Sequence, residues 1–298
     1  MINSHGQELF CTTTEKAFNK KLESLNIDES TIEVIKEKRV IEKWQDTAKG
    51  VMLGKANKLK RESGTDCVLI AIGGKTNFRD RLALLHSKYK DREGSYRPPH
   101  LSEVRALLRS ILPYEESVDM EADDIISMYQ YKGREDQSYI VCTEDKDAKQ
   151  TPGFLFNPRK LEIKDCSGFG SLELKVKTSA SDKKTYSVDG KGRCWFYYQV
   201  VCGDKVDTYH PFVKKVSDLK FYQSFEGITT DKEAWELVAK FYKEEFGDCT
   251  EWTDWKGDTH EGTWVDILQV YADVVHMKRW DNDRIDVKSV LKKFEIIE

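Results

Sequence analysis

The sequence lacks several features that mark specialised classes of protein. No run of 18 apolar residues occurs in its 298 residues, so we expect no membrane-spanning helix. Residues 1–6 carry no charged segment that leads into an apolar core, which argues against a signal peptide. The seven cysteines form no Cys-x-x-Cys pair, and no Cys/His spacing suits zinc. Their odd number indicates reduced thiols in a cytoplasmic protein.

An excess of positive charge is also missing. The formal net charge is −4, with 34% charged and 39% hydrophobic residues. This composition is typical of a soluble globular chain of one large domain or two ordinary ones. It excludes general affinity for nucleic acids, so any such contact requires a local basic patch.

Such a patch is present between residues 75 and 109. Nine basic residues stand there against four acidic ones, and Phe78, Tyr89 and Tyr96 are interleaved with them. The basic residues are Lys75, Arg79, Arg81, Lys88, Lys90, Arg92, Arg97, Arg105 and Arg109. A solvated helical face would have a similar composition. The aromatic residues and the position after an expected strand favour a phosphate-binding arch or loop.

Three acidic motifs follow the patch. They are Glu121-Ala122-Asp123-Asp124, Asp145-Lys146-Asp147 after Glu144, and Gly203-Asp204-Lys205-Val206-Asp207. Each alone could be the charged start of a helix or a surface turn. Carboxylates that converge from separate elements make an oxygen site suited to Mg²⁺ or Mn²⁺. If the chain stays extended after the second expected strand, both aspartates of the middle motif point to one side. The motifs together favour metal-assisted phosphodiester hydrolysis.

The hydrophobic pattern predicts an α/β fold. We expect buried strands at 67–72, closed by Gly73-Gly74, and at 138–142, as neighbours in a parallel sheet. Helices are expected within 14–64, with a capping-box start at residues 30–33, and at 101–112, 121–132, 231–246 and 263–280. Residues 171–188 read as a solvated β-hairpin. Ligands of such sheets collect beyond the carboxyl ends of the strands, where the acidic motifs fall.

Read together, the motifs resemble the 5′-nuclease family, which comprises phage 5′→3′ exonucleases, flap endonucleases and the 5′-nuclease domain of bacterial DNA polymerase I. The family pattern is FR…YK…R, EADD, a strand that ends in DxD, and GDxxD. The first part is matched here by Phe78-Arg79 and Tyr89-Lys90 with Arg92, and the acidic motifs match the rest. The likeness covers about half of the chain, residues 66–210. Its matched residues are most similar to those of phage-encoded members.

The resemblance implies a fold and a domain organisation. Residues 1–200 would form a mainly parallel α/β nuclease core of the PIN/5′-nuclease type. A helical arch would occupy about 75–110, and a β-hairpin insertion about 171–198. Residues 201–298 would form a helical, DNA-binding C-terminal region. The protein would be a monomer in the cytoplasm of a phage-infected bacterium, and it would act on DNA with free 5′ ends or flaps.

The resemblance also implies residue roles. Two Mg²⁺ or Mn²⁺ ions would activate water and stabilise the leaving oxygen. The first ion would be served by Glu121, Asp123 and Asp145, and the second by Asp147, Asp204 and Asp207, with Asp124 in support. Lys90 and Arg79 would neutralise charge on the scissile phosphate. The remaining DNA contacts would be Lys75, Phe78, Tyr89, Arg97 and Arg92, of which the last would hold the 5′ strand.

Three departures from the family pattern qualify these roles. The early strand that ends in a metal-binding Asp has no counterpart, and Gly74 stands where a second Asp is usual. After Asp207 the chain reads Thr208-Tyr209-His210-Pro211-Phe212 instead of a glycine-rich helix-hairpin-helix. We therefore expect a truncated or divergent 5′→3′ deoxyribonuclease with impaired activity. The alternatives are a catalytically deficient homologue that binds DNA or a partner, and a ribonuclease of the PIN type.

Overall fold

The computed structural model describes residues 15–26, 28, 44–91, 100–179, 181–212, 214–248 and 251–298. The chain divides into two compact units, residues 1–44 and 45–298. Within the first unit, the described residues form helix α1 (Glu15–Leu25). The capping-box start expected at residues 30–33 lies outside the described part of the chain.

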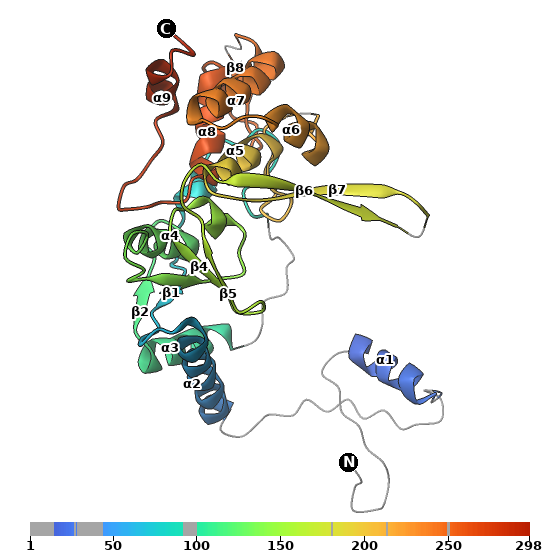
Figure 1. Cartoon of the computed structure of the whole chain (residues 1–298), viewed down its shortest axis with the longest axis vertical. Coiled ribbons are helices and arrows are strands. Elements are labelled where there is room, and N and C mark those ends of the chain that lie inside the picture. The colour runs from blue at the N-terminus through green and yellow to red at the C-terminus, as the bar shows by residue number, and fades with distance from the viewer. Residues whose placement is uncertain are drawn as a thin grey trace, which may run out of the picture. The chain divides into compact units, whose positions relative to one another are not determined.

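The second unit is a mixed α/β structure (Figure 1). Its helices are α2 (Trp44–Ser63), which begins at the unit boundary, α3 (Leu101–Ile111), α4 (Ala122–Lys132), α5 (Arg193–Cys202), α6 (Asp218–Phe225), α7 (Asp231–Phe246), α8 (Trp264–Val275) and α9 (Val287–Lys293). The 3₁₀ turns η2 (Phe78–Arg81) and η3 (Asp147–Gln150) complete the helical elements of the described residues. None of the helices placed by the structure is long and apolar enough to cross a membrane.

The strands form small separate sheets rather than one parallel sheet. β1 (Ile70–Ile72) pairs in parallel with β2 (Tyr114–Glu116), and β3 (Ile140–Cys142) pairs in parallel with β4 (Phe154–Asn157). β5 (Glu162–Asp165) adds to β4 antiparallel, and β8 (Glu251–Thr253) and β9 (Thr259–Glu261) form a short ribbon. The expectation that 66–74 and 138–142 are neighbours in one sheet is wrong, because β1 and β3 belong to different sheets.

The strand expected at 67–72 is also shorter than predicted. Only its last three residues pair, while Cys67 is exposed and Leu69 keeps 40% of its surface in solvent. Helix α4 packs against both β1 and β3, so it joins the two small sheets. β1 is parallel to β2, whose carboxyl end leads to the start of α4, so the carboxyl end of β1 lies on that side.

The β-hairpin is confirmed. β6 (Ser171–Thr178) and β7 (Lys184–Lys191) pair antiparallel over eight residues each, from Ser171 opposite Lys191 to Thr178 opposite Lys184. Figure 1 shows the hairpin extending away from the helices of its unit. It ends earlier than the 198 expected, because the chain from Arg193 onward forms helix α5.

Helix α5 is the centre of the hydrophobic core. Nine of its ten residues, from Cys194 to Cys202, are buried, as expected for a helix that is apolar on every side. The amphipathic helices α7 and α8 pack on it, each begun by a threonine capping box. The core runs without interruption from α5 into the C-terminal helices, across the expected boundary near residue 200.

The segment expected to form a helical arch is only partly helical in what the structure describes. Between 75 and 91 the helical residues are those of η2, and α3 crosses from β1 to β2. Arg92, Arg97 and Tyr96 lie outside the described residues, as does the Pro98-Pro99 pair ahead of α3.

Candidate metal centre

The end of α5 delivers two carboxylates. Gly203 caps the helix with φ +69°, a left-handed conformation that favours glycine. A Cβ at this position would lie 2.3 Å from the carbonyl oxygen of Tyr209. Asp204 and Tyr209 exchange two backbone hydrogen bonds of 2.9 and 3.1 Å, which close a short loop around Asp207. Both aspartates are buried, so the loop aims them at the protein interior.

The chain after β3 delivers two more. The chain does not stay extended there, because Lys146 is in the right-handed helical region and Asp147 begins η3. The backbone N–H of Asp147 donates to Asp145 Oδ1 at 3.0 Å. Gln199 Nε2, from the middle of α5, donates to Asp147 Oδ1 at 2.5 Å. This amide holds the Asp147 carboxylate toward the loop that follows α5.

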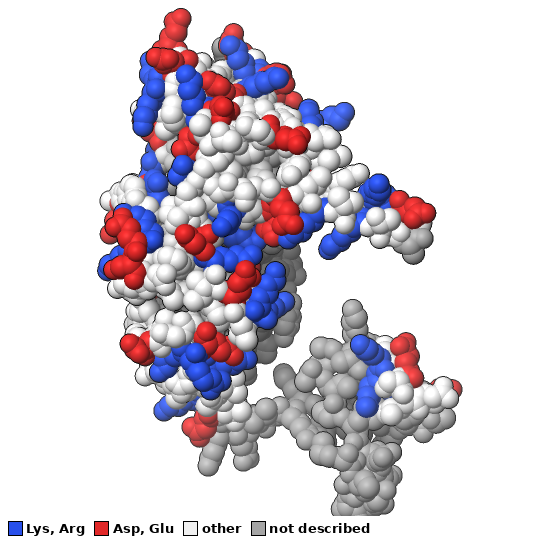
Figure 2. Space-filling model, viewed as in Figure 1, with Lys and Arg blue, Asp and Glu red and all other residues white. Residues whose placement is uncertain are grey.

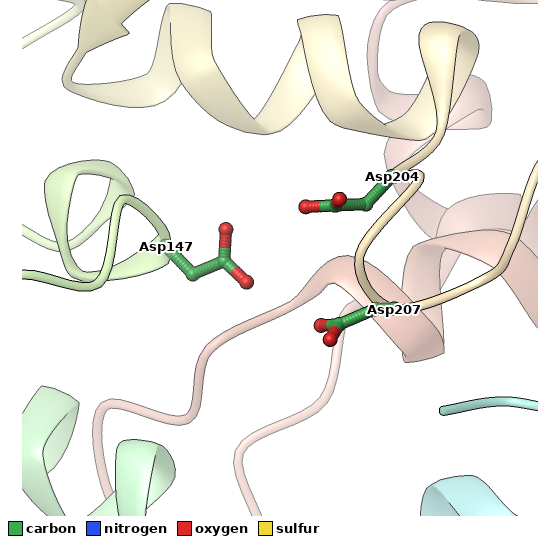
Figure 3. A group of neighbouring side chains, drawn as sticks. All are labelled: Asp147, Asp204 and Asp207. Atoms are coloured by element: carbon green, nitrogen blue, oxygen red, sulfur yellow. The ribbon is translucent and has the colours of Figure 1, made fainter. Parts of the chain in front are cut away.

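Three of these carboxylates meet. One oxygen from each of Asp147, Asp204 and Asp207 lies within 4.8 Å of the other two. Figure 3 shows the carboxyl groups facing a common space, with Asp147 on one side and the loop after α5 on the other. Hard oxygen donors at this spacing suit a divalent cation such as Mg²⁺. The structure therefore contains a triad that could hold a metal ion.

The EADD helix adds carboxylates to the same neighbourhood. Burial, followed by the negative charge of Asp145, raises the pKa of Asp123 to about 6. Burial also raises the pKa of Asp207; the positive charge of Lys90 opposes this shift, while the negative charges of Glu121 and Asp145 add to it. Carboxylates from all three sequence motifs thus repel one another, as they would around a shared cation site.

Asp147 shows the strongest effect of this crowding. Burial and the charge of Asp145 raise its pKa to about 7, although the hydrogen bond from Gln199 favours the charged form. Without a cation, Asp147 is therefore partly protonated at neutral pH. A metal ion must displace this proton, which makes binding stronger as the pH rises.

Asp124 points elsewhere. Its carboxylate accepts two hydrogen bonds from Arg79, of 2.6 and 3.0 Å. Burial alone would raise the pKa of Asp124, but the hydrogen bond and charge of Arg79 outweigh it and lower the pKa. Arg79 also donates to the carbonyl oxygens of Val274 (2.8 Å) and His276 (2.7 Å). The pair ties η2 and α4 to the chain at the end of α8.

This geometry does not support the expected phosphate contact of Arg79. The residue is 1% exposed, and each of its three guanidinium nitrogens already donates a hydrogen bond. Asp124 likewise has no oxygen turned to the triad, so its supporting role is the placement of Arg79 and α4. Both are positioning residues.

Lys90 lies beside the carboxylate cluster. Its ammonium group is 2.7 Å from Glu121 Oε1 and 3.6 Å from Asp207 Oδ2. Its backbone N–H donates to the carbonyl oxygen of Asp207 at 2.9 Å. Charge attraction from Glu121 and Asp207 outweighs the effect of burial and raises the pKa of Lys90. The lysine is therefore a fixed cation at the edge of the cluster.

Two aromatic residues of the basic segment, Tyr89 and Phe78, are less exposed than a DNA contact would require. Tyr89 is 4% exposed, and its hydroxyl donates to Glu121 Oε2 at 2.8 Å, so it supports the site instead of offering a ring to DNA. Phe78 is half-buried, with the cations of Arg79 and Lys278 at 4.6 and 4.7 Å from its ring centre. Lys75 is exposed and keeps its expected freedom to contact a phosphate.

Lys146 was missed by sequence reasoning. Its ammonium group lies 2.6 Å from Asp204 Oδ2, where it neutralises one member of the triad. The attraction of Asp204 outweighs burial and raises the pKa of Lys146. The signal was its position between the two aspartates of the middle motif, which placed it next to the expected ions.

Gly74 lies where the backbone leaves no room for a side chain. A Cβ on Gly74 would lie 2.0 Å from the carbonyl oxygen of Ser117, which follows β2. The backbone N–H of Gly74 donates to the Ser117 hydroxyl at 2.8 Å. No side chain, and so no metal-binding Asp, fits here without movement of the backbone.

No protein-family model and no curated protein matches this chain. The chemistry of the carboxylate cluster therefore carries the functional proposal.

Proposed function

We propose that this protein is a metal-dependent 5′→3′ exonuclease or flap endonuclease that hydrolyses DNA phosphodiesters. The observation that carries the proposal is the triad of Asp147, Asp204 and Asp207, whose ligand oxygens lie within 4.8 Å of one another. The ordered resemblance to the 5′-nuclease family supplies the reaction class. The cluster fits the group that this reaction requires, because its donors are carboxylate oxygens.

Each side chain has a role in this proposal. Asp147, Asp204 and Asp207 would hold one Mg²⁺ or Mn²⁺ ion, and Glu121, Asp123 and Asp145 a second. Bound ions of this kind supply an activated water and stabilise the leaving oxygen. Gln199 keeps the Asp147 carboxylate oriented, and the pair of Arg79 and Asp124 fixes the start of α4.

Lys90 is the residue that links metal binding to substrate. Its ammonium group lies 2.7 Å from Glu121 and 3.6 Å from Asp207. Ions bound to those carboxylates would leave the ammonium group free to meet the scissile phosphate. A fixed cation at that point stabilises the charge that develops in the transition state.

DNA with free 5′ ends or flaps is the substrate that the resemblance suggests. Lys75 and the basic segment after β1 would meet its phosphates. We further propose a monomer of phage origin that works in the host bacterial cytoplasm, in keeping with the free cysteines among the described residues.

A catalytically deficient homologue that binds DNA is the second candidate, and one observation favours it. Lys146 and Lys90 neutralise carboxylates of the cluster within the chain itself, at 2.6 Å from Asp204 and 2.7 Å from Glu121. Two of the carboxylates are therefore neutralised by lysines of the chain, a role that a bound ion would otherwise fill. In addition, Gly74 leaves no room for a further acidic ligand.

One assay separates the two candidates. Degradation of 5′-labelled duplex and flapped DNA is measured with Mg²⁺ and with Mn²⁺, for the wild type and for Asp147→Asn. The matched control is Glu144→Gln, because Glu144 lies in the same loop but pairs with Arg159 at 2.6 Å. We expect cleavage by the wild type and Glu144→Gln, and loss of at least about a hundredfold for Asp147→Asn, the scale on which one transition-state contact acts.

Two other outcomes decide against the nuclease. Intact DNA binding without metal-dependent cleavage by the wild type supports the deficient homologue. Cleavage that Asp147→Asn leaves unchanged points to a contaminating nuclease or to a different active site.

A further inference from the structure

The distal half of the β6–β7 hairpin carries positive charge that neither the fold nor the candidate metal centre uses. Lys177, Lys183 and Lys184 are exposed, and none of them forms an ion pair with another described residue. Asp182 is the single acidic residue among 176–186. On a chain of net charge −4, this is a local surplus of two positive charges. Figure 2 shows basic side chains along the arm that projects to the right.

The register of the hairpin gives its two faces different characters. Side chains alternate along each strand, so Leu172, Leu174 and Val176 share one face. At the root of the hairpin this face packs into the hydrophobic core, where Val188 is buried opposite Leu174. The other face carries Lys175 and Lys177, both exposed to solvent.

The root of the hairpin is fixed to the segment that holds the metal centre. Lys149, two residues after Asp147, places its ammonium group 2.5 Å from Asp189 of β7. The backbone N–H of Gly192, where the hairpin ends, donates to the carbonyl oxygen of Lys149 at 2.8 Å. The root of the hairpin is therefore held by the same short segment that positions Asp147.

The distal half contributes little to the stability of the fold. Val176 is 50% exposed, and every strand residue from Lys175 to Thr178 faces solvent. A two-stranded hairpin without a packed face is marginal in water. At the tip, the N–H of Ser179 donates to the carbonyl oxygen of Lys183, and Asp182 takes the left-handed conformation with φ +56°. The arm is thus built to present its lysines outward.

We propose that this hairpin is an arm that binds the phosphate backbone of DNA at a distance from the cleaved bond. The proposal rests on the proposed nuclease function, and it names the hairpin lysines as the contact. Unpaired ammonium groups suit phosphates of any sequence, since each phosphate carries one negative charge and no base information. No aromatic side chain of the arm is fully exposed, which favours backbone contact over stacking on bases.

The dimensions set the reach of the arm. Helix α5 joins the hairpin to the triad and has ten residues, so it spans about 15 Å. Each hairpin strand has eight residues and spans about 27 Å. The lysines near the tip therefore lie no more than about 40 Å from the triad, which corresponds to about 12 base pairs at ~3.4 Å each. The arm would contact DNA up to about one helical turn from the reaction.

The test compares binding of long and short DNA by two variants of equal charge. The arm variant is Lys177→Ala with Lys183→Ala and Lys184→Ala. The control removes three exposed lysines of α9, which lies on the opposite side of the unit in Figure 1: Lys288→Ala, Lys292→Ala and Lys293→Ala. Binding to 5′-flapped duplexes of about 24 and about 6 base pairs, lengths chosen on either side of the reach, is measured in Ca²⁺ over a range of salt concentrations.

We expect the arm variant to bind the long duplex at least about tenfold more weakly, with a salt dependence lower by about two to three released ions. The α9 control should match the wild type on both lengths, and all three proteins should bind the short duplex alike. Replacing the three arm lysines by arginine should preserve binding to the long duplex, because arginine retains the charge.

The arm is disproved if the arm variant and the α9 control bind the long duplex with the same affinity and salt dependence. Equal losses of affinity on both duplex lengths would also overturn it. They would show that the lysines attract DNA of any length and do not contact a distant part of the duplex. If the wild type binds neither duplex, the proposed nuclease and the arm fail together. That result differs from failure of the arm alone, in which the wild type and the arm variant bind the long duplex equally well.

Discussion

Arg79 and Arg81 make the same bidentate pair with an aspartate in opposite surroundings. Arg79 is buried with Asp124, at 2.6 and 3.0 Å, while Arg81 meets Asp119 at 2.8 and 2.6 Å in solvent. Removal of one partner from a buried pair leaves the other charged and desolvated. An exposed pair loses little, because water and salt already screen it.

We therefore expect Arg79→Ala to lower the free energy of unfolding by about 3–5 kcal/mol. Arg81→Ala, the matched control, should lower it by no more than about 1 kcal/mol. Urea unfolding of the metal-free variants measures both. Similar losses at the two sites would show that Arg79 does not join the elements as its hydrogen bonds indicate.

Lys90 and Lys88 provide a second comparison at this scale. Lys90 is held at the carboxylate cluster, whereas Lys88 is exposed and makes no ion pair among the described residues. We expect Lys90→Ala to slow single-turnover cleavage of a flapped DNA by about 10²–10³-fold and to weaken binding in Ca²⁺ only slightly. Lys88→Ala should leave the cleavage rate near that of the wild type. A normal rate with weakened binding would make Lys90 a positioning contact for DNA.

At the scale of elements, the end of α5 decides where the triad forms. Gly203 has a positive φ and no space for a Cβ, while Gly227 has a positive φ of 84° and open space around it. Alanine at Gly227 should cost about 1–2 kcal/mol, the strain of a left-handed residue. Alanine at Gly203 should cost more and also displace Asp204, because the Cβ meets the Tyr209 carbonyl oxygen.

Mn²⁺ titration and thermal unfolding check this expectation together. Gly203→Ala should bind Mn²⁺ more weakly than the wild type, and Gly227→Ala should bind it with unchanged affinity. If both variants keep the affinity of the wild type, the cap does not position the triad.

Elements whose ends or periodicity are marked by neighbouring residues could be predicted from the sequence. Helices α4 and α7 begin at acidic capping boxes, and the alternation of β6 defines the hairpin. β2 was not foreseeable, because Tyr114–Glu116 is short and polar, and it pairs with β1 only across the intervening helix. Helix α5 has no amphipathic period, since it is buried on all sides, so its apolar run did not specify a helix.

The same division holds for the candidate site. The carboxylates could be predicted, because their motifs carry a charge pattern that local sequence displays. The roles of Arg79 and Tyr89 could not, since both depend on burial by distant segments. Arg79 donates hydrogen bonds to the carbonyl oxygens of Val274 and His276, which lie almost two hundred residues further along the chain. A basic sequence context does not show whether a cation faces solvent or the interior.

At the scale of the whole molecule, the acidic cluster links stability to pH. The folded-state pKa of Asp147 is about 7 and that of Asp123 about 6, both above the ordinary value of 3.8. Between pH 4 and 7 these two carboxyl groups therefore hold more protons in the folded protein than in the unfolded chain. Stability that these groups contribute is present at low pH and is lost as the pH rises through this window.

We accordingly expect Mg²⁺ to raise the midpoint of thermal unfolding by more at pH 8 than at pH 5.5, because protons compete with the ion at low pH. Asp147→Asn should reduce this pH-dependent gain, while Glu144→Gln should preserve it. Differential scanning calorimetry at fixed Mg²⁺ provides the measurement. An equal rise at both pH values would indicate that Mg²⁺ binds away from the raised-pKa carboxylates.

The two internal cations, Lys146 and Lys90, have a consequence for how this protein can evolve. A carboxylate cluster held together only by bound ions would cease to fold in any descendant that lost a ligand. Here the nearest ammonium groups lie 2.6 and 2.7 Å from cluster oxygens, so a variant that no longer bound ions would keep part of the charge neutralisation that the cluster requires. Natural selection can then retain that protein for another task. In such a lineage, ion binding would be lost before the fold.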